Sequence, residues 1–124
     1  MRYDPNQAVD AKEWLELDEG ERIALAEDYH RRAKLKAPNE NLHAVIHAIV
    51  ENQVALGAGY PVAVKLRQLM DEGLNRHDAV HAIGSVLAER IFEVMGGGGG
   101  DDLNAPYLKD LAKLTAKKWL ASGQ

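Results

Sequence analysis

The chain has no cysteine among its 124 residues, which excludes disulfides and restricts any metal ligands to imidazole, carboxylate, amide or water. It also has no run approaching the roughly 18 apolar residues that cross a bilayer. No apolar segment follows Met1–Asn6, so the start does not have the pattern of a secretory signal. We therefore expect a cytoplasmic protein that makes no membrane contact.

Aromatic residues are scarce, at 6%, and alternating runs of β-branched residues are missing, which argues against strands. The net charge of -4 shows no basic excess, so no nucleic-acid partner is expected. A hydrophobic content of 46% with 27% charged residues is typical of a soluble globular protein. We expect one domain spanning residues 1–124, large enough to bury a core.

Helix-start and helix-stop residues recur along the whole chain. Asp10, Asp18 and Asn75 stand where N-caps are expected, and Gly57 and Gly73 where helices should stop. The N-terminal arm, residues 1–17, would hold a short helix, and residues 96–103 would form a glycine-rich flexible loop. The predicted helices cover residues 11–17, 18–34, 41–56, 61–72, 76–95 and 104–121.

A weak internal repeat has a period of 34 residues, since His43–Ile49 aligns with His77–Ile83. A period near 34 matches repeats of paired helices that stack on one another. We therefore predict an all-α fold of five to six helices in an irregular α-α array, either an armadillo-like superhelix or an orthogonal bundle.

Each copy of the repeat places two histidines four residues apart, on one helix face. The helix around His43 and His47 is apolar on nearly every side, which predicts burial among other helices. Gly84 would allow the second histidine helix to approach it closely, against Ala44 and Ala48. The two histidine pairs should therefore converge.

One hypothesis is a metal site, because helical bundles build such sites from ligands on facing helices. Zinc, iron or manganese would suit it, although nothing in the sequence requires a cofactor. Glu89 is a further carboxylate on the second helix. The His-Glu-x-x-His pattern of zinc peptidases is absent. The candidate ligands are His43, His47, Glu51, His77 and His81.

A second enzymatic hypothesis is a helical metal phosphohydrolase of the HD type, with the doublet His77-Asp78 at its centre. His43 or His47 would be the first ligand. The last would come from Asp101, Asp102 or Asp110. At a helix start, however, Asp78 is explained by favourable interaction with the helix dipole.

The alternative to both is a buried hydrogen-bonded network of the histidines with Glu51, Gln53 and Ser85 that fixes helix register. It favours a binding or scaffold module over an enzyme, with a protein partner or homodimerisation. Trp14 or Trp119 would lie at such a contact. Trp14, Trp119 and Phe92 are interpreted as core or interface anchors, and His30 as a residue favourable to the helix dipole.

Three segments together resemble a bacterial family known only as a domain of unknown function: Tyr29–Arg32, His43–Gln53 and Glu72–Leu87. The resemblance covers about residues 18 to 95. It implies an all-helical fold of the armadillo-like kind and brings no activity with it. The family pattern marks six residues in this chain: His43, His47, Glu51, Gln53, His77 and His81.

Overall fold

The computed structural model describes residues 2–33, 40–96 and 104–122, and all regular structure within these ranges is helical. The predicted all-α fold is therefore confirmed, but the described residues form seven α-helices rather than five or six. They are α1 (Ala11–Glu16), α2 (Glu19–Ala33), α3 (Glu40–Ala55), α4 (Pro61–Asp71), α5 (Arg76–Met95), α6 (Asn104–Lys113) and α7 (Ala116–Ala121), with a 3-10 turn η1 (Gly57–Gly59) after α3. Most of the predicted glycine-rich loop, residues 97–103, lies outside the described ranges.

The extra helix arises because the predicted final helix is broken into two. The backbone of Thr115 is extended, which ends the helical path. Its side chain accepts a hydrogen bond from the Lys118 amide and caps the start of α7. The predicted caps Asp10, Asp18 and Asn75 do accept hydrogen bonds from amides of the following first turn. Gly73 follows α4 with φ +111°, a conformation that glycine adopts without strain.

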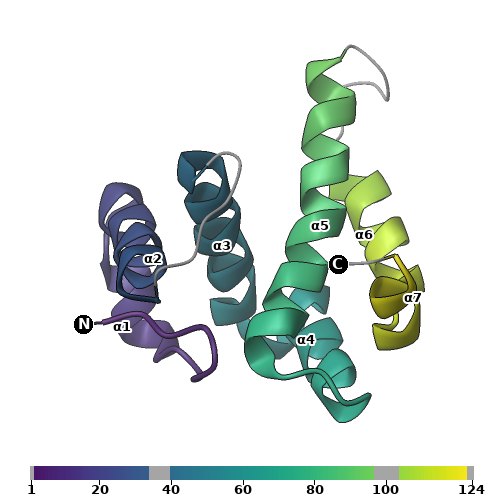
Figure 1. Cartoon of the computed structure of the whole chain (residues 1–124), viewed down its shortest axis with the longest axis horizontal. Coiled ribbons are helices and arrows are strands. Elements are labelled where there is room, and N and C mark those ends of the chain that lie inside the picture. Colours follow the sequence, from purple (N-terminus) through teal and green to yellow (C-terminus); the bar gives the residue numbers. More distant parts are fainter. Residues whose placement is uncertain (1, 34–39, 97–103, 123–124) are drawn as a thin grey trace.

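Helix α3 lies between two groups of helices (Figure 1). The helices α1 and α2 pack on one side of it, and α5 packs on the other. Helix α4 contacts both α3 and α5, and α6 and α7 contact α5. This order places His43 and His47 of α3 between α2 and α5, beside His30 and His81.

Two hydrophobic clusters form the core. The larger joins α3, α4, α5, α6 and α7 around Val50, Leu69 and Ile83, and the smaller joins α1, α2 and α3 around Trp14. Ala44 and Ala48 belong to the smaller cluster, on the α2 side of α3. The prediction that Gly84 contacts this alanine face is therefore wrong.

Gly84 instead packs against Ile46. A Cβ built on Gly84 would lie 3.0 Å from Ile46 Cγ2, which is too close for an ordinary contact. The glycine thus allows α5 to approach α3 closely, as predicted, but on a different side of α3. This approach brings the histidines of the two helices together.

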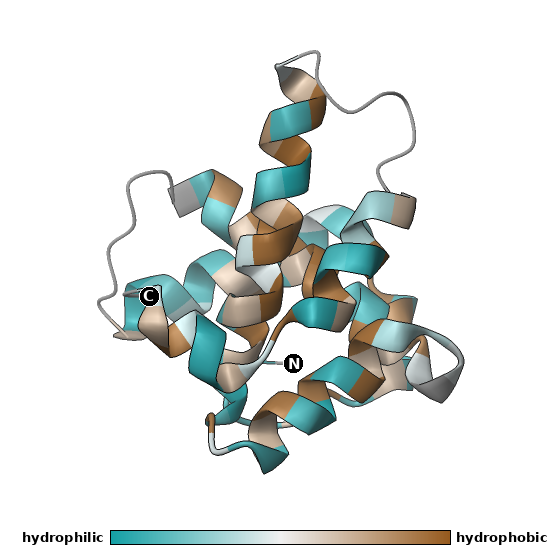
Figure 2. Cartoon of the chain, turned by 90° about the vertical axis from the view of Figure 1, so that its right-hand side faces the viewer, coloured by the Kyte–Doolittle hydropathy of each residue, from teal (hydrophilic) through white to brown (hydrophobic). Residues whose placement is uncertain are grey.

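The end of α5 projects beyond the neighbouring helices (Figure 2). Phe92 is 58% exposed there, so of its two predicted roles, core anchor or interface anchor, the first is wrong. Trp14 is completely buried, which removes it as a surface contact, and Trp119 is 8% exposed. Among the described helices, none has the length and apolar content to cross a membrane.

Candidate metal centre

The five histidines of the chain converge on one place from three helices. His30 comes from the last turn of α2, His43 and His47 from α3, and His77 and His81 from α5. His47 is central, since its ring centroid lies 4.9 Å from those of His43 and His81, 5.2 Å from that of His30 and 5.6 Å from that of His77. The predicted convergence of the two pairs is thus observed, and His30 joins them.

The ring nitrogens are close enough to share an ion. The Nε2 atoms of His43 and His81 lie 3.1 Å apart. Two groups of ligand atoms each fall within 4.8 Å of one another: His30, His43 and His47, and His47, His77 and His81. Since a metal–imidazole bond is about 2.0–2.1 Å, nitrogens on one ion lie about 3 Å apart when adjacent. The spacing of His43 and His81 matches that value.

Glu51, a candidate ligand from the sequence, belongs to neither group of ligand atoms. Its carboxylate accepts two hydrogen bonds from Arg76, each 2.8 Å long, and one of 2.6 Å from the hydroxyl of Tyr3. Both side chains of this ion pair are buried, so breaking it would leave an uncompensated charge. Glu51 therefore contacts the histidines indirectly, through the Tyr3 hydroxyl that lies between Glu51 and His47.

Tyr3 fixes the tautomer of His47. Its single hydroxyl proton goes to Glu51, so the oxygen, 3.1 Å from His47 Nδ1, can only accept there. Burial raises the pKa of Tyr3, with the Glu51 charge adding to the effect, so the proton stays on the phenol. His47 therefore donates through Nδ1 and carries its lone pair on Nε2.

His30 is oriented in the same way by its own helix. Its Nδ1 lies 2.8 Å from the carbonyl oxygen of Ala26, which can only accept. A neutral His30 thus also presents its lone pair on Nε2. In metal sites, a partner on the outer nitrogen commonly fixes the ring in this manner.

Three of the inward nitrogens have no partner within the described chain. The Nε2 atoms of His30, His47 and His77 are buried and make no hydrogen bond. Buried polar atoms almost always have a partner, and an unpaired one is costly. No described residue supplies that partner, and a water molecule or a metal ion would provide one.

The surroundings keep His43, His47, His77 and His81 neutral. Burial, together with the repulsion between neighbouring histidines, lowers the pKa of His47 to about 2 and that of His81 to about 3. Burial, with His30 and His77 nearby, lowers the pKa of His43 to about 4, and burial also lowers that of His77. At neutral pH these rings carry free lone pairs, the form that binds metals.

A cavity of about 180 Å³ adjoins the cluster between α3 and α5. Three histidines contribute to its wall, and the other side chains there are small or apolar. Its lining residues are His43, Ile46, His47, Val80, His81, Gly84, Ser85 and Ala88.

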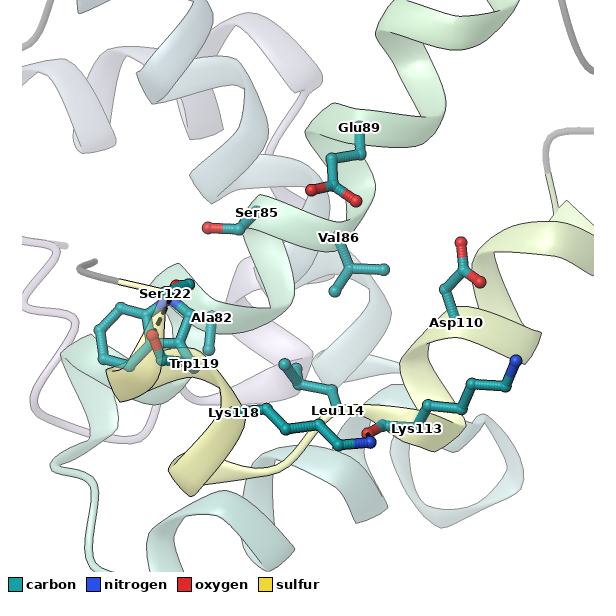
Figure 3. A pocket seen from close by; sticks show the side chains of 10 residues that line it. All are labelled: Ala82, Ser85, Val86, Glu89, Asp110, Lys113, Leu114, Lys118, Trp119 and Ser122. Carbon is teal, nitrogen blue, oxygen red and sulfur yellow. Dashed lines mark hydrogen bonds between the residues drawn. The ribbon is translucent and has the colours of Figure 1, made fainter.

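A larger cavity, of about 320 Å³, lies between α5 and the C-terminal helices and has no histidine in its wall (Figure 3). Glu89 and Asp110 line it, and Asp110 is paired with Arg90. Neither carboxylate belongs to the histidine groups, so the structure does not bring Glu89 to the cluster, nor Asp110 as the phosphohydrolase hypothesis requires. Asp101 and Asp102 lie outside the described residues.

The remaining predicted residues bond elsewhere. Gln53 accepts from Tyr107, Ser85 donates to the His81 carbonyl, and the Asp78 amide donates to the Asn75 cap. The network of histidines with Gln53 and Ser85 side chains is therefore not formed.

Sequence reasoning missed His30, Tyr3 and Arg76. His30 was explained as a helix-end residue, yet it is 8% exposed and packs 4.6 Å from His43, centroid to centroid. One signal in the sequence could have indicated Tyr3 and Arg76: a glutamate buried on an apolar helix needs a cationic or hydroxyl partner. Tyr3 and Arg76 lie 48 and 25 residues from Glu51 in the chain, so no local pattern links them.

Comparison with known proteins identifies no matching family model, no matching curated protein and no matching solved structure. The resemblance to a bacterial family of unknown function therefore stays a prediction.

Proposed function

We propose that the chain is a metal-binding protein, in which the histidine cluster holds a divalent first-row transition metal. The observation that carries this proposal is the set of buried, inward-facing Nε2 atoms without partners. His47 would be the central ligand, with His43 and His81 beside it and His30 or His77 at either end.

The donor set favours particular metals. Neutral imidazoles suit zinc, copper, nickel and iron, whereas manganese and magnesium prefer carboxylate oxygens. Because Glu51 is held by Arg76 and Tyr3, the available donors are nitrogens only. This favours zinc or iron over manganese among the metals considered from the sequence. Any hydrolytic activity would need a water molecule on the same ion.

The test is metal titration of the purified chain after removal of bound metal with a chelator. We expect saturable binding of Co²⁺, followed by its absorption bands, and competition by Zn²⁺. His47→Ala should abolish tight binding, because His47 belongs to both groups of ligand atoms. Glu89→Gln, on the same helix as His77 and His81 but at the other cavity, is the matched control and should bind normally.

His81→Gln, at a less buried position, provides a second variant if His47→Ala does not fold. Circular dichroism establishes that each variant is folded. Unchanged cobalt affinity in both folded histidine variants would overturn the proposal.

The finer architecture is also proposed rather than shown: an irregular α-α array in which the two histidine segments are a diverged repeat. The cytoplasmic location, the bacterial source and the association with a second copy or a protein partner remain predictions. The exposed apolar side chains of Phe92 and Met95, at the projecting end of α5, support a partner surface there. Sedimentation of the wild type against Phe92→Ser tests self-association at this end.

A further inference from the structure

The ligand set proposed above would leave the charge of a metal ion unbalanced. Imidazoles bind as neutral ligands, and Glu51, the carboxylate among the candidate ligands from the sequence, is neutralised by Arg76 at 2.8 Å. Asp4 and Asp78 act on His77, at one end of the cluster, and neither belongs to a group of ligand atoms. A divalent ion held by these histidines would therefore have no negatively charged ligand. A buried charge without a counter-charge is costly.

The protein leaves space for a counter-charge beside the ring nitrogens. The cavity of about 180 Å³ has His43, His47 and His81 in its wall. A water molecule takes roughly 30 Å³ in the liquid, so this space accommodates only small molecules. Neither an acidic side chain, which would repel an anion, nor a basic one, which would bind it without a metal, is among the lining residues.

The other lining residues restrict the kind of molecule that binds. They are Ile46, Val80, Gly84, Ser85 and Ala88, which offer one side-chain hydroxyl, and that hydroxyl donates to the carbonyl of His81. A large polar substrate would find few hydrogen-bond partners there. A small anion would instead be held by direct coordination to the ion.

Resting on the proposed metal-binding function, we propose that this cavity is the binding site for a small anion that completes the coordination of the metal. The chemical class is a compact inorganic anion or a short carboxylate. The anion would coordinate on the side where His43, His47 and His81 meet the cavity.

The experiment uses azide as the probe on the cobalt-loaded full-length chain. We expect azide to change the cobalt absorption spectrum saturably. Ala88→Leu fills part of the cavity and should lower azide affinity by about tenfold or more through steric overlap, while cobalt affinity is unchanged. Ala24→Leu, the same substitution at an exposed position on α2, is the matched control and should bind azide normally.

The outcomes separate the two proposals. If cobalt does not bind, the metal-binding function fails and this inference fails with it. If cobalt binds but azide leaves the spectrum unchanged, only the anion site is overturned. Equal azide affinity in wild type and Ala88→Leu would also overturn the placement in this cavity. If Ala88→Leu does not fold, azide affinity is measured on Ser85→Leu, which fills the same cavity from the preceding turn of α5.

Discussion

The Nε2 atoms of His43 and His81 lie 3.1 Å apart across the contact between α3 and α5. Two neutral imidazoles can share one proton at this distance, or both can bind one ion. The first arrangement satisfies these two rings but leaves the buried Nε2 atoms of His30, His47 and His77 unpaired. The second would also offer a partner to the neighbouring Nε2 atoms, because His47 belongs to both groups of ligand atoms.

His30 should affect metal binding although it was not recognised from the sequence. Its Nδ1 bonds to its own helix, which aims Nε2 at the cluster. We expect His30→Ala to weaken Co²⁺ binding by about tenfold or more if it is a ligand, as loss of one ligand would. Competition titration measures the affinity. Lys12→Ala, an exposed change on α1, is the control, and equal affinity for His30→Ala and wild type would exclude His30 as a ligand.

Tyr3→Phe tests whether the orientation of the His47 ring contributes to metal affinity, because it leaves the imidazole itself in place. The change removes the hydroxyl that accepts from His47 Nδ1 and donates to Glu51, so the lone pair of His47 is no longer fixed on Nε2. Metal affinity should fall by about 10–100-fold, the usual effect of losing an outer partner of a ligand.

Tyr107→Phe is the matched control for this change. It removes a hydrogen bond to Gln53 away from the histidines, so it should lower stability and leave metal affinity intact. If both variants bind metal like wild type, Tyr3 has no orienting role.

The metal-free protein should lose stability on mild acidification. The folded pKa values of His43, His47 and His81 lie below the unfolded value near 6.5, so the unfolded chain binds more protons as pH falls. These histidines should therefore leave the free energy of unfolding unchanged between about pH 7 and 8 and lower it between about pH 6.5 and 5.

Urea unfolding in the presence of a chelator measures this dependence. The interval lies above the pKa of most carboxylates, so it isolates the histidines. In His81→Gln the slope should decrease by up to about 1.4 kcal/mol per pH unit. A stability that does not change from pH 7 to 5 would contradict the neutral, buried state of these rings.

Gly84→Ala should destabilise the fold despite the better helix propensity of alanine. The new Cβ would meet Ile46 Cγ2 at 3.0 Å, and overpacking of this kind typically costs about 1–3 kcal/mol, against about 1 kcal/mol gained from propensity. Adding Ile46→Leu removes the branched methyl and should restore part of the loss. Urea unfolding of the single and double variants tests this, and a stabilised Gly84→Ala would show that Ile46 yields easily.

The helices were predictable because their signals are local. Asp10, Asp18 and Asn75 cap helices where the sequence indicated, and the spacing of four residues placed each histidine pair on one face. The break at Thr115 was missed although its signal is equally local, since the threonine side chain caps α7 through the Lys118 amide.

By itself, the sequence determined the all-helical class, the burial of α3 and the meeting of the two histidine pairs, since each follows from periodicity and composition. Only the tertiary structure decided which side chains surround the two histidine pairs. It placed His30 beside them because α2 packs against α3, and it placed Glu51 in an ion pair because Arg76 and Tyr3 reach it from distant parts of the chain. Such contacts depend on how helices pack in space, which no local pattern encodes.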